Sequence, residues 1–128
     1  MSKENVEVVR RLFESYQRRD YHAAAECLSP EVVYEVGQEL PLRGREEVRA
    51  MWGRWDATWD ELETVPEEFV DAGDEVLVTV HYSARGRGSG IAYDERLYEV
   101  YGFERGRCVH KREFRWRSEA LAAAGLDR

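Results

Sequence analysis

Cysteine is scarce in this sequence: its 128 residues include two, Cys27 and Cys108. Two cysteines so far apart give neither the ligand spacing of a zinc site nor a disulfide framework. Both lie in apolar surroundings, so we expect them to be reduced and to pack in the core. The sequence also lacks a metal-ligand cluster, a dinucleotide-binding fingerprint and a nucleophile motif. We therefore expect neither a metal nor a cofactor.

Long apolar runs and an excess of basic residues are missing as well. No stretch approaches the roughly 20 apolar residues of a membrane span, and the first residues, MSKENVEVVRR, lack the apolar core of a signal peptide. The 26 acidic and 19 basic residues give a formal net charge of -7. Nucleic acids and anionic membranes bind proteins with a positive face. We expect a cytoplasmic protein whose partners include neither a nucleic acid nor a membrane.

The sequence does contain enough apolar residues for one hydrophobic core. Hydrophobic residues make up 43% of the chain, and this length is typical of one domain, so we expect a single domain over residues 1–128. In the first half, apolar residues recur at steps of three and four, which predicts helices. One helix should end near Arg19, a second should span Tyr21–Leu28 and a third should run from about Val48 to Leu62. A strand is predicted over Glu31–Val36.

From Val65 onward the apolar pattern changes to a period of two, which is typical of strands. Four strands separated by turn residues are predicted, over Val65–Val70, Glu75–Ala84, Ala92–Glu104 and Arg107–Arg117. A short helix should follow over 118–124, with Ser118 as its N-cap. Helices followed by antiparallel hairpins indicate an α+β fold in which the helices cover one face of a curved sheet.

Four segments resemble recurring signatures of one protein family: LRGREEV at 42–48, EEFVDAGD at 67–74, RGRGSG at 85–90 and EALAAAGL at 119–126. With the order of the predicted elements, they make this sequence similar to SnoaL-like proteins of the nuclear transport factor 2-like superfamily. The resemblance implies a curved, mixed or antiparallel sheet wrapped around the N-terminal helices, forming a cone-shaped α+β barrel with an internal pocket. It also implies a homodimer formed through the outer face of the sheet. It does not fix a reaction, because this fold carries several activities.

Strand alternation and the resemblance together separate the side chains that face the pocket from those that face outward. We expect Glu99 and Glu113 to be catalytic carboxylates. The predicted substrate-binding residues are Tyr16, Tyr34, Val36, Trp52, Trp55, Val80, Tyr82, Tyr101 and Lys111, with Phe13 and Trp59 completing the wall. The expected outward set is Thr79, His81, His110, Arg112, Phe114 and Trp116. Two exposed aromatic side chains on that face favour its burial in a dimer.

The resemblance to ketosteroid isomerases provides one functional group of three. Glu99 matches the position of the acid that donates a proton to the substrate oxyanion. Val36 occupies the position of the general base, and Leu12 occupies that of the oxyanion-binding tyrosine. Because both of these groups are missing, we expect no isomerase activity on a steroid ketone.

The resemblance to limonene epoxide hydrolases is also incomplete. Tyr34 matches a tyrosine that positions water, and Glu113 matches one catalytic carboxylate on the last strand. Val36 replaces an asparagine, while Val80 and Tyr82 stand where an arginine and an aspartate are required to activate water and protonate the epoxide. We therefore do not expect epoxide hydrolysis.

The predicted pocket remains suited to acid–base chemistry. Two carboxylates in an apolar pocket repel each other and lose hydration, which can tune one of them into a general acid or base. A three-residue loop with a glycine bulge at 105–106 would place Glu99 directly opposite Lys111, as an ion pair. The favoured function is a cofactor-independent isomerase or cyclase acting on a small apolar, polyketide-like molecule. A non-catalytic ligand-binding or dimerisation module is the alternative, with Glu99 and Lys111 as a structural ion pair and Glu113 balanced by a nearby arginine.

Overall fold

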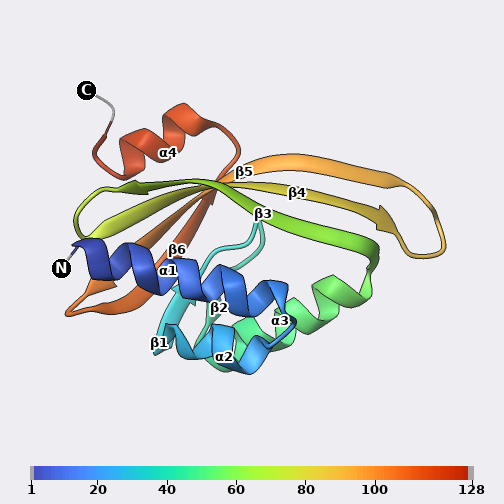
Figure 1. Cartoon of the computed structure of the whole chain (residues 1–128), viewed down its shortest axis with the longest axis horizontal. Coiled ribbons are helices and arrows are strands. Elements are labelled where there is room, and N and C mark those ends of the chain that lie inside the picture. The colour runs from blue at the N-terminus through green and yellow to red at the C-terminus, as the bar shows by residue number, and fades with distance from the viewer. Residues whose placement is uncertain (1, 127–128) are drawn as a thin grey trace.

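The computed structural model describes residues 2–126, which form four helices and six strands around a curved sheet (Figure 1). The helices are α1 (Ser2–Gln17), α2 (Tyr21–Glu26), α3 (Arg45–Ala57) and α4 (Arg117–Ala123). The strands are β1 (Leu28–Tyr34), β2 (Leu42–Arg43), β3 (Trp59–Asp71), β4 (Glu75–Gly86), β5 (Ala92–Glu104) and β6 (Arg107–Phe114). The predicted α+β class is confirmed.

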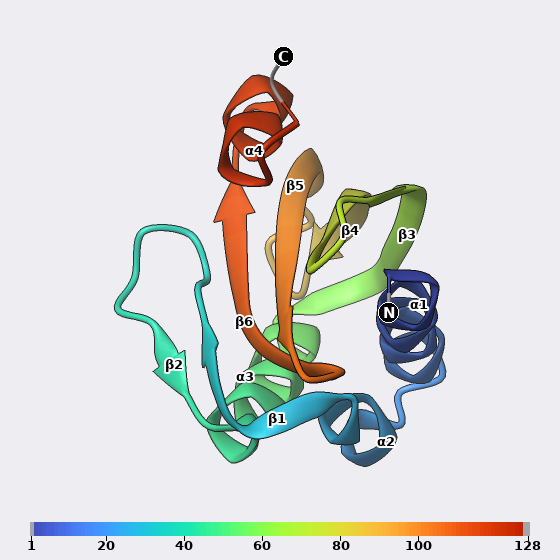
Figure 2. The ribbon, with the colours of Figure 1, turned by 90° about the vertical axis from the view of Figure 1, so that its left-hand side faces the viewer.

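The strands form one sheet in the order β2-β1-β6-β5-β4-β3. All neighbouring pairs are antiparallel except β1 and β6, which are parallel. The sheet is curved but does not close into a barrel, because β2 and β3 remain as its two edges. Figure 2 shows β1 bending away beneath β5 and β6, with α1 beside β3 and α4 at the far end. The helices α1 and α3 thus complete the wall of the cone that the sheet leaves open.

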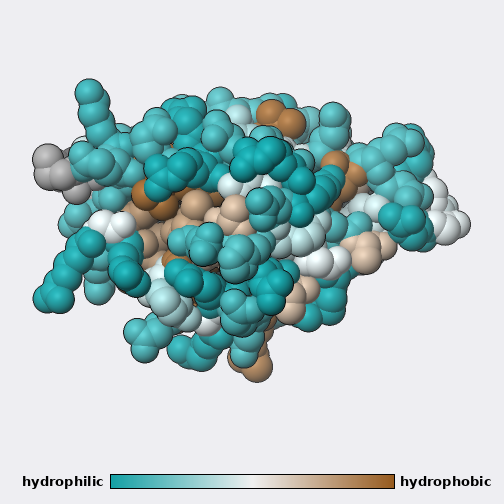
Figure 3. All heavy atoms as spheres, turned by 60° about the horizontal axis from the view of Figure 1, so that its bottom comes forward, coloured by the Kyte–Doolittle hydropathy of each residue, from teal (hydrophilic) through white to brown (hydrophobic). Residues whose placement is uncertain are grey.

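Apolar side chains on the two faces of β4 belong to two separate cores. Val76, Val78 and Val80 are buried on the inner face with residues of α1, as strand alternation predicts. Leu77 points to the other face, where it is buried against Ala120 of α4. Helix α4 therefore covers part of the outer sheet face. The opposite side of the molecule, which carries the other helices, is mainly hydrophilic, with hydrophobic side chains gathered between polar ones (Figure 3).

The third helix is shorter than predicted, and the strand after it is longer. The spacing of apolar residues places Trp59 and Leu62 on the helix, but α3 ends at Ala57 and β3 begins at Trp59. Leu62 and Thr64 are buried while their neighbours are exposed, which is the alternation of a strand. Over this short stretch the apolar residues fit both the helical period and the strand period. The strand forms because β3 pairs with β4 along almost its whole length.

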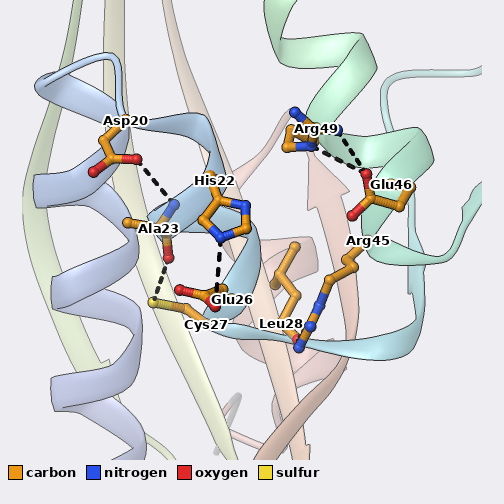
Figure 4. Close-up of polar contacts among 9 residues, drawn as sticks. All are labelled: Asp20, His22, Ala23, Glu26, Cys27, Leu28, Arg45, Glu46 and Arg49. Carbon is orange, nitrogen blue, oxygen red and sulfur yellow. Dashed lines mark hydrogen bonds and ion pairs between the residues drawn. The ribbon is translucent and has the colours of Figure 1, made fainter.

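Figure 4 shows the polar contacts around α2 and the start of β1, which is tied to α3. The Asp20 carboxylate accepts a hydrogen bond from Ala23 N–H at 3.1 Å, so it caps α2. Strand β1 begins at Leu28, earlier than predicted. The Leu28 carbonyl accepts two hydrogen bonds from the Arg45 guanidinium at the start of α3. At the other end of the chain, Ser118 is not the N-cap of α4, because that helix begins one residue earlier, at Arg117.

The hairpin between β5 and β6 has a different register from the predicted one. Arg105 and Gly106 both have positive φ, 52° and 78°, and form a two-residue turn. Glu104 therefore pairs with Arg107, and a bulge between Gly102 and Phe103 sets the pairing beyond it. As a result Glu99 lies opposite Glu113, and Tyr101 lies opposite Lys111. The predicted cross-strand pair of Glu99 and Lys111 is wrong.

Candidate functional site

A cavity of about 310 Å³ lies between the inner face of the sheet and helices α1 and α3. The predicted site residues that line it are Tyr16, Tyr34, Val36, Trp52, Trp55, Tyr82, Glu99, Tyr101, Lys111 and Glu113. The other lining residues come from α1, α3, β3, β5 and the loop after β1, and they include Leu12, Met51, Thr64, Tyr93 and Leu97. Aromatic side chains therefore form a large part of the wall, and the charged groups come mainly from β5 and β6.

Two residues predicted for the wall lie outside it. Val80 is fully buried in the hydrophobic core and does not line the cavity. Trp59 begins β3, where its ring packs against Trp55 at 5.2 Å and Tyr93 at 5.0 Å between ring centres. Val80 does not reach the cavity wall because Tyr82, two residues further along the inner face of β4, occupies that position. Trp59 does not reach it because α3 ends before this residue.

Glu99 is buried at the centre of a set of tyrosines. One carboxylate oxygen accepts a hydrogen bond from the Tyr82 hydroxyl at 2.5 Å, and the other accepts from the Tyr101 hydroxyl at 2.6 Å. Both oxygens are therefore acceptors in this network. The proton-donating role that the isomerase resemblance implies for Glu99 does not match this arrangement, because a donor acid needs a free O–H directed at its ligand.

Lys111 and Glu113 form an ion pair at the side of the cavity next to the loop that follows β1. The Lys111 ammonium lies 3.2 Å from a Glu113 oxygen and donates to the Glu35 carbonyl at 2.7 Å. It also sits 4.3 Å from the centre of the Tyr34 ring, as a cation–π contact. The second Glu113 oxygen accepts from Gly37 N–H at 2.8 Å. Both side chains thus hold the loop as well as each other.

Burial shifts the proton affinities of the groups around this ion pair. Desolvation raises the pKa of Tyr34 to about 12, although the Lys111 ammonium acts in the opposite direction. Desolvation also raises the pKa of Tyr82 and of Tyr101, and the charge of Glu99 adds to it. Burial alone would lower the pKa of Lys111, but the surrounding phenol and carboxylates outweigh it and raise the pKa. All these tyrosines remain neutral donors near neutral pH.

Asp56 is the functional group that the sequence pattern does not reveal. Its carboxylate accepts from the Tyr16 hydroxyl at 2.5 Å and from the Tyr21 hydroxyl, and it lies 3.4 Å from the Arg19 guanidinium. Tyr16 lines the cavity, so Asp56 fixes the direction of one hydroxyl group in its wall. Tyr93 and Leu97 could have been found from the sequence, because they share the strand parity of Glu99.

A second, smaller cleft of about 220 Å³ lies on the far side of α1, beside the two cysteines. Arg11, Arg45 and Arg107 line it together with Glu26, and Arg45 is occupied by the Leu28 carbonyl. Cys27 and Cys108 are both free thiols, and burial raises the pKa of each.

None of the helices within residues 2–126 has the length and apolar character required to cross a membrane.

Comparison with known proteins agrees with this architecture. A solved structure of a nuclear transport factor 2-like protein of unknown function from Burkholderia pseudomallei is similar, with a TM-score of 0.79 and 22% identity over 93% of this chain and 95% of that one. A hypothetical protein with a ketosteroid isomerase-like fold from Catenulispora acidiphila, solved in complex with trimethylamine, has a TM-score of 0.76 and 17% identity over 94% of this chain and 93% of that one.

A third similar structure is a putative SnoaL-like polyketide cyclase from Jannaschia, with a TM-score of 0.79 and 22% identity over 99% of this chain and 94% of that one. No curated protein sequence matches the chain. At these identities the solved structures establish the fold alone. The sequence model of the SnoaL-like domain matches residues 9–111, which is most of the chain. This protein therefore belongs to the SnoaL-like domain family.

Proposed function

We propose that this protein is a cofactor-independent isomerase or cyclase that binds a small, largely apolar molecule in the cavity and moves a proton on it. The observation that carries the proposal is the position of Glu113. Its carboxylate is in the cavity wall, mostly buried, and fixed by Lys111 on one oxygen and by Gly37 N–H on the other. A carboxylate held in one orientation within an apolar cavity is suited to general-base catalysis.

The remaining groups have distinct roles in this scheme. Lys111 contacts one Glu113 oxygen at 3.2 Å and so fixes the orientation of the carboxylate that would accept the proton. Each Glu113 oxygen accepts one hydrogen bond in the structure, which leaves lone-pair capacity for a substrate proton. Glu99 holds the Tyr82 and Tyr101 hydroxyl groups in place and shapes the polar end of the cavity. The likeness to a putative polyketide cyclase supports chemistry on a small organic molecule.

A non-catalytic binding module is the second candidate, and one observation favours it. Leu12 and Val36 both line the cavity, and they carry no group able to transfer a proton or bind an oxyanion. These are the two positions at which the isomerase resemblance requires a tyrosine and a base. A protein with this cavity can therefore bind a ligand without changing it.

Deuterium exchange separates the two candidates even when the reaction product is unknown. We expect mass spectrometry of the purified protein to identify a bound small molecule, since the cavity is concave and lined by many aromatic side chains. That molecule is then incubated in deuterium oxide with and without protein. Protein-dependent deuterium incorporation at a carbon atom is the expected result for an acid–base enzyme. A bound ligand that gains no deuterium would contradict catalysis and establish the binding module.

We also propose that the protein is a homodimer formed through the outer face of the sheet. Helix α4 covers part of that face and packs against Phe114, so less of it is free than the sequence indicated. Trp116 is still 60% exposed, beside the covered area. Light scattering should give about twice the chain mass of 15.0 kDa. Trp116→Arg should reduce the dimer fraction, whereas Leu40→Ser, on the loop after β1, should not. A monomer mass at micromolar concentration would disprove the dimer.

A further inference from the structure

We infer that the ligand of this cavity is an organic cation, a protonated or quaternary amine with an apolar body and one hydrogen-bonding substituent. This inference rests on the proposed function only in using the same cavity as the ligand site. It names the chemical class of the ligand, which the proposed function does not specify. Three independent observations support it: the charge balance of the wall, the aromatic surfaces and one unpaired hydroxyl group.

The charge balance of the wall is negative. Among the described residues that line the cavity, Glu39, Glu99 and Glu113 carry carboxyl groups, and Lys111 is the only basic residue. A cationic ligand offsets this excess, whereas an anionic ligand would add to it. Charge in an apolar cavity acts over a longer range than in water, because solvent screening is weak there.

Lys111 is not available to bind an anionic ligand. Its ammonium already contacts Glu113, the Glu35 carbonyl and the ring of Tyr34. The Lys111 side chain is only 3% exposed, whereas the side chain of Glu113 is 14% exposed. The charge that a ligand meets on the β6 side of the cavity is therefore the carboxylate.

The aromatic wall is suited to hold a cation. The Lys111 ammonium lies over the Tyr34 ring, which shows that a ring in this wall already binds a cation through its face. Trp52 packs edge-on against Tyr34, and Trp55 packs edge-on against Tyr93, so the planes of these four lining rings differ in orientation. Several aromatic faces around one site are the usual arrangement for binding a methylated or protonated amine.

One polar group in the wall has no partner within residues 2–126. Thr64 lies on β3 at the cavity, it is only 5% exposed, and its hydroxyl group makes no hydrogen bond. A buried hydroxyl without a partner costs stability, which a ligand can recover by supplying one. The ligand therefore combines a cation for the carboxylates with a hydroxyl or carbonyl group for Thr64.

Choline and the neutral alcohol in which carbon replaces its nitrogen provide the direct test, since the two have the same shape and the same hydroxyl group. Isothermal titration calorimetry should show that choline binds about tenfold more tightly, from the combined ionic and cation–π attraction. Glu113→Gln should reduce that preference to about threefold or less. Glu104→Gln removes the same charge from an exposed site at the end of β5 and should leave the preference unchanged.

The inference would be overturned if the neutral alcohol bound as tightly as choline. It would also be overturned if 3,3-dimethylbutanoate, an anion of similar shape, bound more tightly than either. Absence of binding by all three would also overturn it for ligands of this size. These results are independent of the proposed catalysis. Glu113-dependent deuterium exchange on a neutral ligand would preserve the enzyme proposal and refute the cation. A choline-like ligand that binds without deuterium exchange would support the cation inference and contradict the enzyme proposal.

Discussion

Replacing Glu113 with glutamine should lower the rate of proton transfer on the bound molecule by about a hundredfold to ten-thousandfold, the usual contribution of a positioned general base. Glutamine has the same shape and can still accept from Gly37 N–H through its carbonyl oxygen. It cannot accept a proton from carbon, so chemistry should be lost while the loop contact persists. Initial rates of deuterium incorporation into the ligand provide the measurement.

The binding affinity of the Glu113→Gln variant distinguishes a lost base from a lost site. We expect the ligand dissociation constant to change far less than the exchange rate, because the aromatic wall is intact. Glu104→Gln serves as the charge-matched control and should exchange at the original rate. An exchange rate within about threefold of the original in Glu113→Gln would show that another group is the base.

Replacing Lys111 with methionine should lower the free energy of unfolding by about 3–5 kcal/mol, the typical cost of removing one partner from a buried ion pair. The substitution keeps a long apolar side chain, so the loss comes from charge. Without the ammonium, Glu113 loses its ionic partner, and Glu99 loses the compensating charge nearby in an apolar environment. The Glu35 carbonyl loses its donor as well. Urea unfolding followed by circular dichroism gives the difference.

The chain contains an internal control, since its other lysine, Lys3, is exposed near the start of α1. Lys3→Met should leave the free energy of unfolding within about 0.5 kcal/mol of the original. The double variant with Lys111→Met and Glu113→Gln should recover part of the loss, because one of the uncompensated carboxylates is removed. A Lys111→Met variant as stable as the original would contradict the role of the ion pair.

The same groups predict a loss of stability at alkaline pH. The pKa of Lys111 is raised above 10.5 in the folded protein, and the pKa values of the buried phenols Tyr34, Tyr82 and Tyr101 are raised above 10.0. The folded protein therefore holds these protons after the unfolded chain has released them. Raising the pH through this range favours the unfolded state, and below it the contribution is fully present. Lys111→Met should show a shallower decline than the original.

Strand parity was predictable from the sequence because it depends on a local alternation. The valines of β4 are strongly apolar on one face, and this assigns the inner face without further information. The register between β5 and β6 could not be predicted in the same way. It depends on the positive φ of Arg105, a residue type that does not favour that conformation, and on a bulge that no residue near Gly102 indicates. The turn shifts the pairing by one residue and the bulge by one more, and together they move the partner of Glu99 from Lys111 to Glu113.

The polar network around Asp56 shows a different limit. Asp56 lies 35 and 40 positions from its two tyrosine partners. In the sequence it is one more acidic residue on a helix that also carries Glu46 and Glu47. Periodicity reports which residues are buried together, but it does not report which hydroxyl group finds which carboxylate. That pairing exists only once α1, α2 and α3 have packed.

The loop after β1 is held by two charged side chains of the cavity wall, because Lys111 donates to the Glu35 carbonyl and Glu113 accepts from Gly37 N–H. Binding of a cation would therefore be coupled to the contacts of this loop. A cationic guest that attracts the Glu113 carboxylate would compete with Gly37 N–H for it, and so would weaken one of the two contacts that hold the loop. A stronger ionic contact between the ligand and Glu113 would therefore not lengthen the residence time of the ligand in proportion. The off-rate of a cationic ligand should vary less across a series than its equilibrium affinity does.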